Sequence, residues 1–309
     1  MSSWWSQCFG LIGLIVVLRL VLTITKAVWV YFLRPGQNLR KLGSWAVVTG
    51  ATDGIGRALC DNLARKGLNV LLISRTESKL VAAAEEVAKK YNVQTKYTVV
   101  DFANADEVTW QRTTTALASL DVGLLINNVG LSYDHCEYLE HLSDQDVRNM
   151  VEVNITSVNQ MTRIALPAMK AHHKGTIVNI GSASGSLVPA TPLTSVYAGT
   201  KAYVDVFTRS MQVELAASGV TYQNMAPLFV ATKMSKIRKP SIAAPSPAQW
   251  ARAAVKHIGY ETISCPYWFH AVEWYCIAVA PAWLMNMYVL NMHLGMRKRY
   301  YKKKNAKAQ

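Results

Sequence analysis

The alternation of short apolar runs with longer segments of helical periodicity is the feature that most restricts the fold. The runs are rich in Val, Ile and Leu, and they recur between residues 45 and 225. Such runs are typical of parallel strands buried on both faces, because the helices that connect them cover the sheet. The pattern predicts an α/β fold with a doubly wound parallel sheet. The expected strands are 45–49, 69–73, 97–100, 122–127, 176–180 and 219–225, and the expected helices are 55–66, 77–90, 104–118, 143–171 and 195–218.

A glycine-rich turn, TGATDGIG at residues 49–56, joins the first expected strand to the first expected helix. Glycines let backbone N–H groups approach a pyrophosphate, and the N-terminus of the following helix favours that anion. The spacing differs from the commoner GxGxxG, but the position between strand and helix is the one that this mechanism requires. The turn therefore predicts a Rossmann-type dinucleotide site that includes Gly50, Thr52, Asp53, Gly54, Ile55 and Gly56.

The ends of the next strands indicate which dinucleotide binds. Ser74 and Arg75 end the second strand, where a carboxylate would bind the ribose 2′-hydroxyl and repel a 2′-phosphate. The guanidinium of Arg75 suits a phosphate instead, which favours NADPH over NADH; a surface arginine is the plainer alternative. Asp101 and Asn128 follow the third and fourth strands, at the edge where such sheets bind ligands, although either could serve a turn.

The most specific chemical pattern is YAGTK at residues 197–201. Positions four apart share one face of a helix, so Lys201 can lie beneath the hydroxyl of Tyr197. A neighbouring ammonium lowers the pKa of a phenol from its usual value of about 10. Tyr197 could then give a proton to a carbonyl oxygen as a hydride reaches the carbon. The pattern predicts an oxidoreductase that acts on a carbonyl or alcohol group.

Two serines lie upstream of this helix, in GSASG at residues 181–185. A serine here can hold the substrate oxygen by a hydrogen bond. The letters also match GxSxG, a hydrolase motif that would be centred on Ser184 and would need His257 with Asp205 or Glu214. A hydrolase does not explain the glycine-rich turn, Arg75 or YAGTK, so hydride transfer is the preferred hypothesis. A cofactor-binding scaffold without catalysis is a third hypothesis.

The apolar run at residues 9–33 predicts an N-terminal membrane helix. Such a helix is about 37 Å long and can cross a hydrocarbon core of about 30 Å with some tilt. Arg19 and Lys26 interrupt the run, so an interfacial helix is the alternative. No positive charge precedes it, which disfavours a secretory signal peptide. The basic residues that follow place the next domain in the cytosol by the positive-inside rule: Arg34, Arg40 and Lys41.

The C-terminal part of the chain is apolar and then basic. Residues 274–292 carry no charge, whereas residues 295–309 contain seven Lys and Arg and no acid. A single span would place the basic tail on the far side of the membrane, so an interfacial or re-entrant segment is expected; a core helix is the alternative. The predicted domains are a membrane anchor at 1–43, an NADPH-binding reductase domain at 44–260, and an apolar membrane-associated segment with a basic tail at 261–309.

Composition and the distribution of charge limit the classes of partner that we expect for this chain. The net charge of +14 lies mostly at the two ends of the chain, beside apolar segments. This pattern suits an anionic membrane surface, and no nucleic-acid-reading motif is present. The five cysteines are scattered, which fits free thiols in a reducing compartment, and the histidines lack metal-ligand spacing. We therefore expect membrane lipid as a partner, no nucleic acid and no metal.

Over residues 44–260 the chain closely resembles the short-chain dehydrogenase/reductase family. The matching motifs occur in order: TGATDGIG, NNVG at 127–130, Asn154, a serine at a strand end, and YAGTK. The resemblance implies that Tyr197 is the acid, Lys201 also holds the nicotinamide ribose, and Asn154 orders a proton-relay water. It implies Ser182 as the fourth catalytic residue by the strand end, whereas the usual spacing points to Ser184; Ser182 is preferred. The remaining cofactor contacts that it implies are Lys79, Val230 and Thr232, with Tyr197 and Lys201.

The whole chain resembles, more narrowly, the very-long-chain 3-oxoacyl-CoA reductases and the related membrane-bound 17-beta-hydroxysteroid dehydrogenases. The carrying segments are the N-terminal anchor, ISRTESKL at 73–80, the stretch 227–247 and the lysine-rich C-terminus, although Leu228 replaces the family's usual glycine. The resemblance implies an endoplasmic reticulum membrane enzyme facing the cytosol. It implies NADPH-dependent reduction of 3-oxoacyl-CoA to 3-hydroxyacyl-CoA in fatty-acid elongation, with 17-ketosteroid reduction as the alternative. An acyl-CoA substrate is implied, and an elongation complex and a homodimer are allowed.

Overall fold

The computed structural model describes residues 2–308, with the side chains of residues 4–306. The last residues of the predicted basic tail, Lys307 to Gln309, therefore fall partly or wholly outside the described part. Contacts divide the chain into two compact units, Met1–Gly36 and Gln37–Gln309. The boundaries expected at 43 and 260 stay a prediction, and the second unit contains both the sheet and the C-terminal helices.

The first unit is an apolar helix. It consists of α1 (Ser2–Val28) and a π-helical turn, η1 (Trp29–Leu33). The 30-residue stretch Trp4–Leu33 is the one helix among residues 2–308 that is long and apolar enough to cross a membrane. Its large apolar side chains are exposed in this unit, as expected of a helix whose partner is lipid. This N-terminal helix suggests membrane anchoring by its length and composition.

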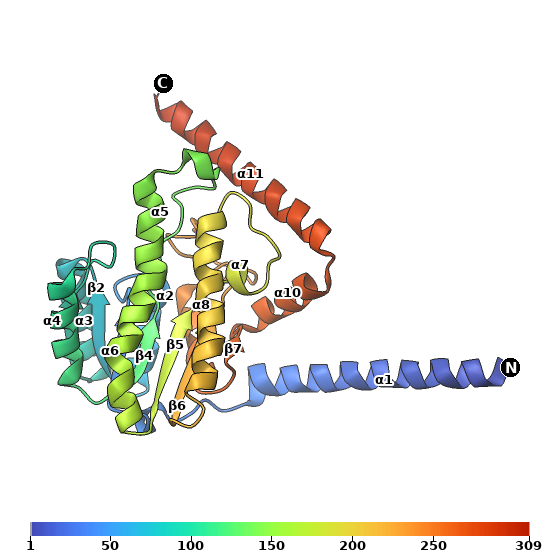
Figure 1. Cartoon of the computed structure of the whole chain (residues 1–309), viewed down its shortest axis with the longest axis horizontal. Coiled ribbons are helices and arrows are strands. Elements are labelled where there is room, and N and C mark those ends of the chain that lie inside the picture. Colours follow the sequence, from blue (N-terminus) through green and yellow to red (C-terminus); the bar gives the residue numbers. More distant parts are fainter. Residues whose placement is uncertain (1, 309) are drawn as a thin grey trace. The chain divides into compact units, whose positions relative to one another are not determined.

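The second unit is organised around a seven-stranded parallel sheet with the order β3-β2-β1-β4-β5-β6-β7 (Figure 1). The predicted α/β doubly wound fold is confirmed, because the order runs outward from β1 in both directions. All six expected strands are present, and the sequence analysis missed only the two-residue β7, which has no apolar run of its own. The strands are β1 (Trp45–Thr49), β2 (Asn69–Ser74), β3 (Thr95–Val99), β4 (Val122–Asn127), β5 (Gly175–Ile180), β6 (Val220–Met225) and β7 (Ile263–Ser264).

Helices cover both faces of this sheet. On one face α2 packs between α3 and α9, and on the other α6 packs near α4 and α8. The long helix expected at 143–171 is divided by a π-helical turn, η4 (Glu152–Thr156). The sequence analysis missed α9, although Ser246 and Gln249 form a capping box at its start. The bounds are α2 (Gly54–Arg65), α3 (Glu77–Tyr91), α4 (Glu107–Ala118), α5 (Asp144–Val151), α6 (Ser157–Ala171), α7 (Ala183–Ser186), α8 (Ser195–Glu214) and α9 (Pro247–His257).

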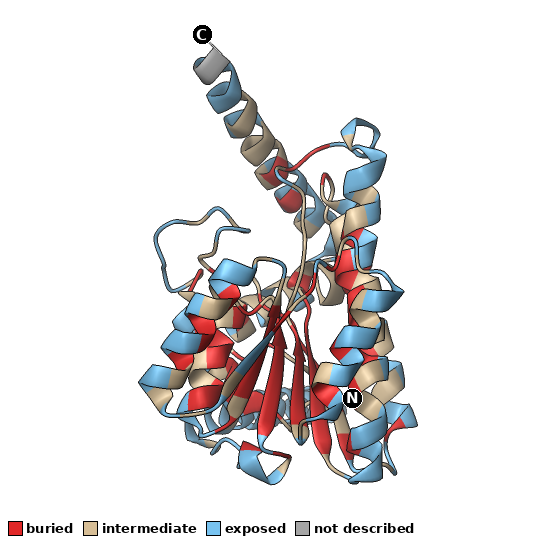
Figure 2. Ribbon diagram, turned by 90° about the vertical axis from the view of Figure 1, so that its left-hand side faces the viewer, coloured by how far each residue is buried: buried red, intermediate tan, exposed pale blue. Residues whose placement is uncertain are grey.

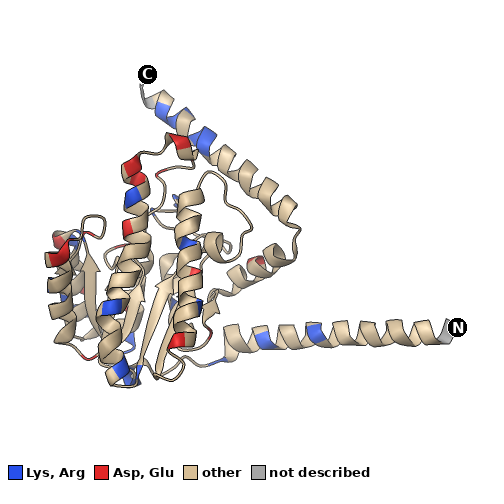
Figure 3. Ribbon diagram, in the orientation of Figure 1, with Lys and Arg blue, Asp and Glu red and all other residues tan. Residues whose placement is uncertain are grey.

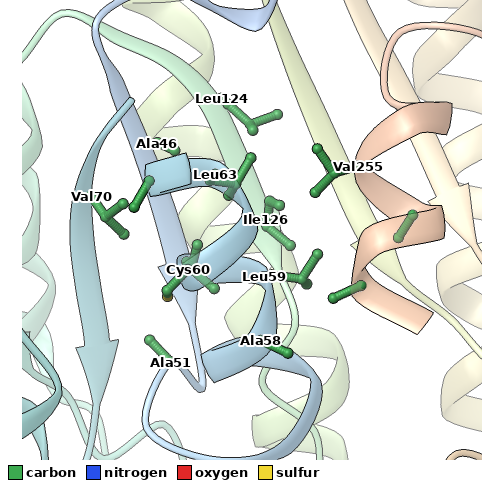
Figure 4. Packing of buried hydrophobic residues seen from close by; sticks show 14 of the residues in the cluster. Ala46, Ala51, Ala58, Leu59, Cys60, Leu63, Val70, Leu124, Ile126 and Val255 are labelled. Atoms are coloured by element: carbon green, nitrogen blue, oxygen red, sulfur yellow. The ribbon is translucent and has the colours of Figure 1, made fainter. Parts of the chain in front are cut away.

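Alternate residues of the strands enter two separate cores. Ala46 and Val48 of β1 pack with α2 and α9, whereas Trp45 and Val47 pack on the opposite face. This two-residue period is the direct consequence of the strand geometry. Figure 4 shows the first core, in which Leu59 and Leu63 of α2 lie over β1 and β4, and Figure 2 shows the buried strands between two helical layers.

The C-terminal segment forms two helices, α10 (Trp268–Val279) and α11 (Ala282–Ala308), separated at Ala280–Pro281. Each contributes buried residues to the second unit: His270 in α10, and Val289 and His293 in α11. The segment also exposes large apolar side chains, including Trp283 and Tyr275. Its association with a membrane stays a prediction.

Replacement of Leu125 tests the central position of β4. Leu125 is fully buried between β1 and β5, so we expect Leu125→Ala to lower the free energy of unfolding by about 2–5 kcal/mol. The measurement is chemical denaturation of the full chain in detergent. Leu139→Ala is the control, since that side chain is 57% exposed and should change stability by less than about 0.5 kcal/mol. Equal losses in the two variants would contradict the assigned core.

Candidate active site

The glycine-rich turn places the start of α2 directly against the end of β1. Gly50 and Gly54 have positive φ angles of 64° and 54°, which favour glycine. A Cβ atom on Gly56 would lie 2.2 Å from the carbonyl oxygen of Gly50, so only glycine fits this close approach. An α-helix leaves its first N–H groups without partners inside the helix, and Ile55 and Gly56 supply two of them here. The turn can therefore hold an anionic diphosphate.

Asn128 braces this turn. Its side-chain amide donates to the carbonyl oxygens of Thr49 (2.9 Å) and Gly50 (3.3 Å). Its backbone N–H donates to the hydroxyl of Thr49 at 2.9 Å. Asn128 thus joins the end of β4 to the end of β1 from beneath the glycines. Its contact with a cofactor stays a prediction, but its contribution to the shape of the turn is direct.

The segment after β6 reaches the same turn from the other side. The methyl group of Thr232 lies 3.6 Å from the position that a Cβ atom on Gly54 would take. Lys233 forms an ion pair with Asp53, whose carboxylate also accepts from the N–H of Gly54 at 2.8 Å. The hydrogen bond from Lys233 lowers the pKa of Asp53, against the opposing effect of partial burial. Val230 is buried nearby in the chain, with its carbonyl oxygen bound by Ser235 (2.6 Å).

The other predicted cofactor residues lie at strand ends. Ser74 shares a hydrogen bond of 3.1 Å with Thr52, which joins β2 to the glycine-rich turn. Arg75 and Lys79 are exposed beyond the end of β2. The carboxylate of Asp101 accepts from Ala103 and Asn104 in its own loop, so its visible contacts are those of a turn. The arrangement places two positive charges just beyond the end of β2, with Glu77 between them in the chain at the start of α3.

Tyr197 and Ser182 meet at the carboxyl end of β5. Ser182 caps the short helix α7, and Tyr197 lies in the first turn of α8. The Ser182 side chain lies close enough to the phenol to lower the pKa of Tyr197. Ser184 donates to the hydroxyl of Ser182 at 2.8 Å, so the two serines form a chain that ends at the phenol. The strand-end choice of Ser182 therefore agrees with the contacts, and its catalytic role stays a prediction.

Lys201 is buried one helical turn beyond Tyr197. Its ammonium donates to the carbonyl oxygen of Ile180 (2.9 Å) and lies 5.9 Å from the centre of the Tyr197 ring. Burial lowers the pKa of Lys201 to about 8. Gly130 lies between two of the predicted catalytic groups, because a Cβ atom there would be 3.6 Å from both the ammonium of Lys201 and the amide oxygen of Asn154.

Asn154 lies in the π-helical turn η4 and is only 1% exposed. Its amide nitrogen donates to Leu131 O (2.8 Å) and to the hydroxyl of Thr200 (2.9 Å). Its amide oxygen accepts from the N–H of Leu131 at 2.7 Å. π-Helical turns occur often at functional sites, where they redirect a side chain. Here the turn directs Asn154 towards α8, and its predicted water-ordering role is untested.

The expectation that Lys201 lowers the pKa of Tyr197 is wrong for this structure. Burial raises the pKa of Tyr197 above its usual value, and the Ser182 side chain offsets this only in part. The ammonium of Lys201 binds the backbone of β5 rather than the phenol. Tyr197 is therefore a neutral phenol at physiological pH, which is the form that can donate a proton.

His270 is a residue of this region that the sequence analysis missed. It is fully buried, and its Nδ1 accepts from the N–H of Leu228 at 3.3 Å. Its Nε2 lies 3.0 Å from Phe229 O and 3.3 Å from Ala243 O, so a neutral ring with its hydrogen on Nε2 satisfies all three groups. Burial lowers the pKa of His270 to about 4. His270 thus holds the segment that contains Val230. No local sequence motif predicts this long-range contact.

The hydrolase arrangement is not present around Ser184. The Ser184 hydroxyl is directed to Ser182, and the imidazole Nδ1 of His257 lies 3.0 Å from Ala253 O in its own helix. Asp205 binds Ser186, Asn224 and Arg209, which fixes α7 against α8. Together these contacts assemble a phenol, a hydroxyl and a buried ammonium beside an anion-binding turn. Such a site can hold a carbonyl oxygen and protonate it.

Comparison with known proteins agrees with this geometry. Residues 44–242 match the family described as short chain dehydrogenase, which confirms the resemblance in the motifs. Very-long-chain 3-oxoacyl-CoA reductase-B of Danio rerio is 42% identical over 286 residues, covering 91% of each chain. The human very-long-chain 3-oxoacyl-CoA reductase is 41% identical, covering 85% of this chain and 83% of its own. The corresponding protein of Anas platyrhynchos is 38% identical, covering 97% and 96%.

Solved structures share the fold. A 7beta-hydroxysteroid dehydrogenase superposes with a TM-score of 0.72 at 22% identity, covering 82% of this chain and 99% of its own. A short-chain dehydrogenase from Sphingobium yanoikuyae in complex with NADPH gives a TM-score of 0.66 at 22% identity, covering 78% and 95%. At this identity they support the fold alone.

The depressed pKa of His270 predicts a loss of stability in acid. Between pH about 6.5 and about 4, His270 is protonated in the unfolded chain but stays neutral in the folded protein. The free energy of unfolding therefore falls as the pH is lowered. The loss from this residue is on the order of 3 kcal/mol. We expect His270→Gln to be less stable at pH 7 and to lose this part of the pH dependence, measured by denaturation at pH 7 and pH 4. The exposed His172→Gln is the control, and parallel pH profiles for wild type and His270→Gln would contradict the assignment.

Proposed function

We propose that this chain, which belongs to the short-chain dehydrogenase family, reduces 3-oxoacyl-CoA to 3-hydroxyacyl-CoA with NADPH. The family comprises oxidoreductases that use NAD(P)(H), so the class of chemistry is given by membership. The proposed substrate rests on one observation, the similarity to proteins named very-long-chain 3-oxoacyl-CoA reductases. This similarity extends along almost the whole chain, including the N-terminal and C-terminal segments. A place in fatty-acid elongation follows from the same similarity.

The residues of the site divide the chemistry between them. The bound dinucleotide supplies a hydride to C3 of the substrate. The hydroxyls of Ser182 and Tyr197, which lie close enough for Ser182 to lower the pKa of the phenol, bind the 3-oxo oxygen, and Tyr197 gives it a proton. The resemblance assigns Lys201 to the nicotinamide ribose, and its ammonium lies 5.9 Å from the centre of the Tyr197 ring. Asn154 holds Thr200 and Leu131 around this group and, by resemblance, orders the water that returns the proton.

The choice of NADPH rests on charge at the end of β2. Arg75 and Lys79 are exposed there and outnumber the one acid between them in the chain, Glu77, while Ser74 rather than a carboxylate ends the strand. The nearby acid, Asp53, is paired with Lys233 and also feels the charge of Lys79. A 2′-phosphate would therefore meet net positive charge. Ser74, Asp101, Asn128, Val230 and Thr232 complete the proposed cofactor contacts.

We further propose that the protein resides in the endoplasmic reticulum membrane with its reductase domain in the cytosol. The support is the apolar helix Trp4–Leu33 followed by basic residues. Anchoring holds the enzyme where long acyl chains concentrate. Arg238 and Lys239 are exposed on the segment after β6 and could attract CoA phosphates, whereas Lys233 and Lys236 are engaged with Asp53 and Asp134. An elongation complex and a homodimer remain proposals from the resemblance.

An assay of the purified full chain tests the reaction. We expect NADPH absorbance to fall with a long-chain 3-oxoacyl-CoA much faster than with a 17-ketosteroid. Tyr197→Phe should abolish turnover and leave NADPH binding intact, because the variant lacks only the donated proton. Ser182→Ala should lower kcat by about 10²- to 10³-fold, since it removes a hydrogen bond to the reacting oxygen.

Ser184→Ala is the matched control for the serine, since its hydroxyl reaches the phenol only through Ser182. Its kcat should remain within a few fold of wild type. Full activity in Ser182→Ala, or turnover retained in Tyr197→Phe, would refute the assigned roles. Faster reduction of the steroid than of the acyl-CoA would overturn the proposed substrate.

Arg75→Ala tests the cofactor preference. Loss of a charged hydrogen bond to the 2′-phosphate should weaken NADPH binding by about 10- to 100-fold while changing NADH binding little. Titration of each dinucleotide by fluorescence measures both constants. Arg65→Ala, at the far end of α2, controls for the general loss of one positive charge. An equal loss for NADPH and NADH would remove the phosphate from the proposed contacts of Arg75.

A further inference from the structure

Helix α11 forms one wall of an apolar groove of about 720 Å³. The opposite walls are the first turns of α8 and the loop that joins α7 to α8, residues 187–194. Small and apolar side chains predominate, and none of the described residues that line the groove is charged. The residues that matter here are Ser184, Val188, Ala198, Ala202, Met287 and Leu290.

Specific contacts fix α11 beside this loop. The Nδ1 of His293 lies 2.6 Å from Pro192 O, and Val289 is only 5% exposed. The N–H of Glu137 donates to Leu193 O at 2.9 Å, which ties the loop after β4 to the same segment. The groove is therefore a built feature of the second unit, with a wall that is held at a defined position.

A buried carboxylate holds the next turns of α11. Glu137 is 3% exposed and accepts from Arg297 Nε at 2.6 Å and from the hydroxyl of Tyr301. Burial opposes the ionisation of Glu137, but the hydrogen bonds from Arg297 and Tyr301 together outweigh this effect and keep the pKa of Glu137 well below its usual range. Figure 3 shows the acidic residues that precede α5 next to the basic stretch of α11. Removing Arg297 would leave this buried carboxylate without its guanidinium partner, so the contact favours one position of α11.

One lining residue, Ser184, links the groove to the reacting groups. Ser184 lines the groove and donates to Ser182 at 2.8 Å. The α8 wall is formed by Ser195, Ala198, Gly199 and Ala202, so Tyr197 lies outside the groove and is reached from it through Ser184 and Ser182. We propose that this groove holds the acyl chain of the substrate, with the 3-oxo group at Tyr197 and the chain running along α11. The proposal rests on the proposed function and names the site that would select chain length.

The chemistry of the groove favours an acyl chain over other occupants. Ligand pockets are commonly about 300–1,000 Å³ and mostly apolar, with few polar groups, and this groove has that character. Its α11 wall lies outside residues 44–242, the part that matches the family as a whole. Hydride transfer is common to the family, so a wall added outside the common part is suited to recognising one substrate.

A pair of neighbouring substitutions on α11 tests the proposal. Both side chains are largely exposed, Met287 at 50% and Tyr288 at 61%, but only Met287 lines the groove. The readout is kcat/KM for 3-oxohexadecanoyl-CoA divided by kcat/KM for 3-oxobutanoyl-CoA, measured with the full chain in detergent. Each buried methylene contributes about fourfold to binding, so displacing two or more from the groove should lower the ratio at least tenfold in Met287→Trp. Tyr288→Trp should leave the ratio within about twofold of wild type.

The outcomes separate the two proposals. If wild type reduces both substrates and Met287→Trp leaves the ratio unchanged, the reductase function stands and the assignment of the groove to the acyl chain is overturned. Occupancy of the groove by a membrane lipid or by a second copy of the chain would overturn that assignment as well. Reduction of neither substrate by wild type would overturn the function, and the acyl-chain site with it. NADPH binding is measured first; if Met287→Trp loses it, Leu290→Trp, one turn further along the same wall, is used with the same expected ratio.

Discussion

Burial of the Lys201 ammonium against the carbonyl oxygen of Ile180 is the interaction on which the site depends. A buried charge is costly unless a polar group compensates it, and here the compensating oxygen is the last of β5. The contact fixes α8 against the end of that strand. Ser182 follows Ile180 by two residues, and Tyr197 precedes Lys201 by one helical turn. One hydrogen bond therefore brings the phenol and the serine hydroxyl together.

The surroundings of this contact leave α8 little freedom. A Cβ atom on Gly185 would lie 2.3 Å from the backbone of Lys201, so glycine is what allows α7 to pack directly on α8. Asp205, further along α8, accepts from Ser186 of α7 and from Asn224 of β6. These hydrogen bonds join α7, α8 and β6, although the amide oxygen of Asn224 accepts none among the described residues. The serine-bearing turn is thus held from both ends, which suits a reaction that needs fixed donors.

The sequence predicts those parts of the molecule that depend on local periodicity. The strands, the glycine-rich turn and the shared face of Tyr197 and Lys201 follow from spacing alone. His270 and Glu137 could not be found in this way, because each acquires its importance from partners that are distant in the chain, Leu228 and Arg297. The prediction for the pKa of Tyr197 has the wrong direction for a related reason. Spacing reveals a nearby cation, but neither the burial that raises this pKa nor the backbone oxygen that the cation binds instead.

The C-terminal segment shows how one stretch of sequence can satisfy two environments. Its apolar composition favours a membrane surface, and Trp283 and Tyr275 are indeed exposed. Yet His270 of α10 contacts the turn that follows β6. His293 and Arg297 of α11 contact the loops around the reacting groups. A helix that only rested on lipid would not need these buried polar contacts, since lipid offers no partner for them. The segment is therefore part of the catalytic unit first, and its exposed apolar side chains are what remains for lipid or for substrate.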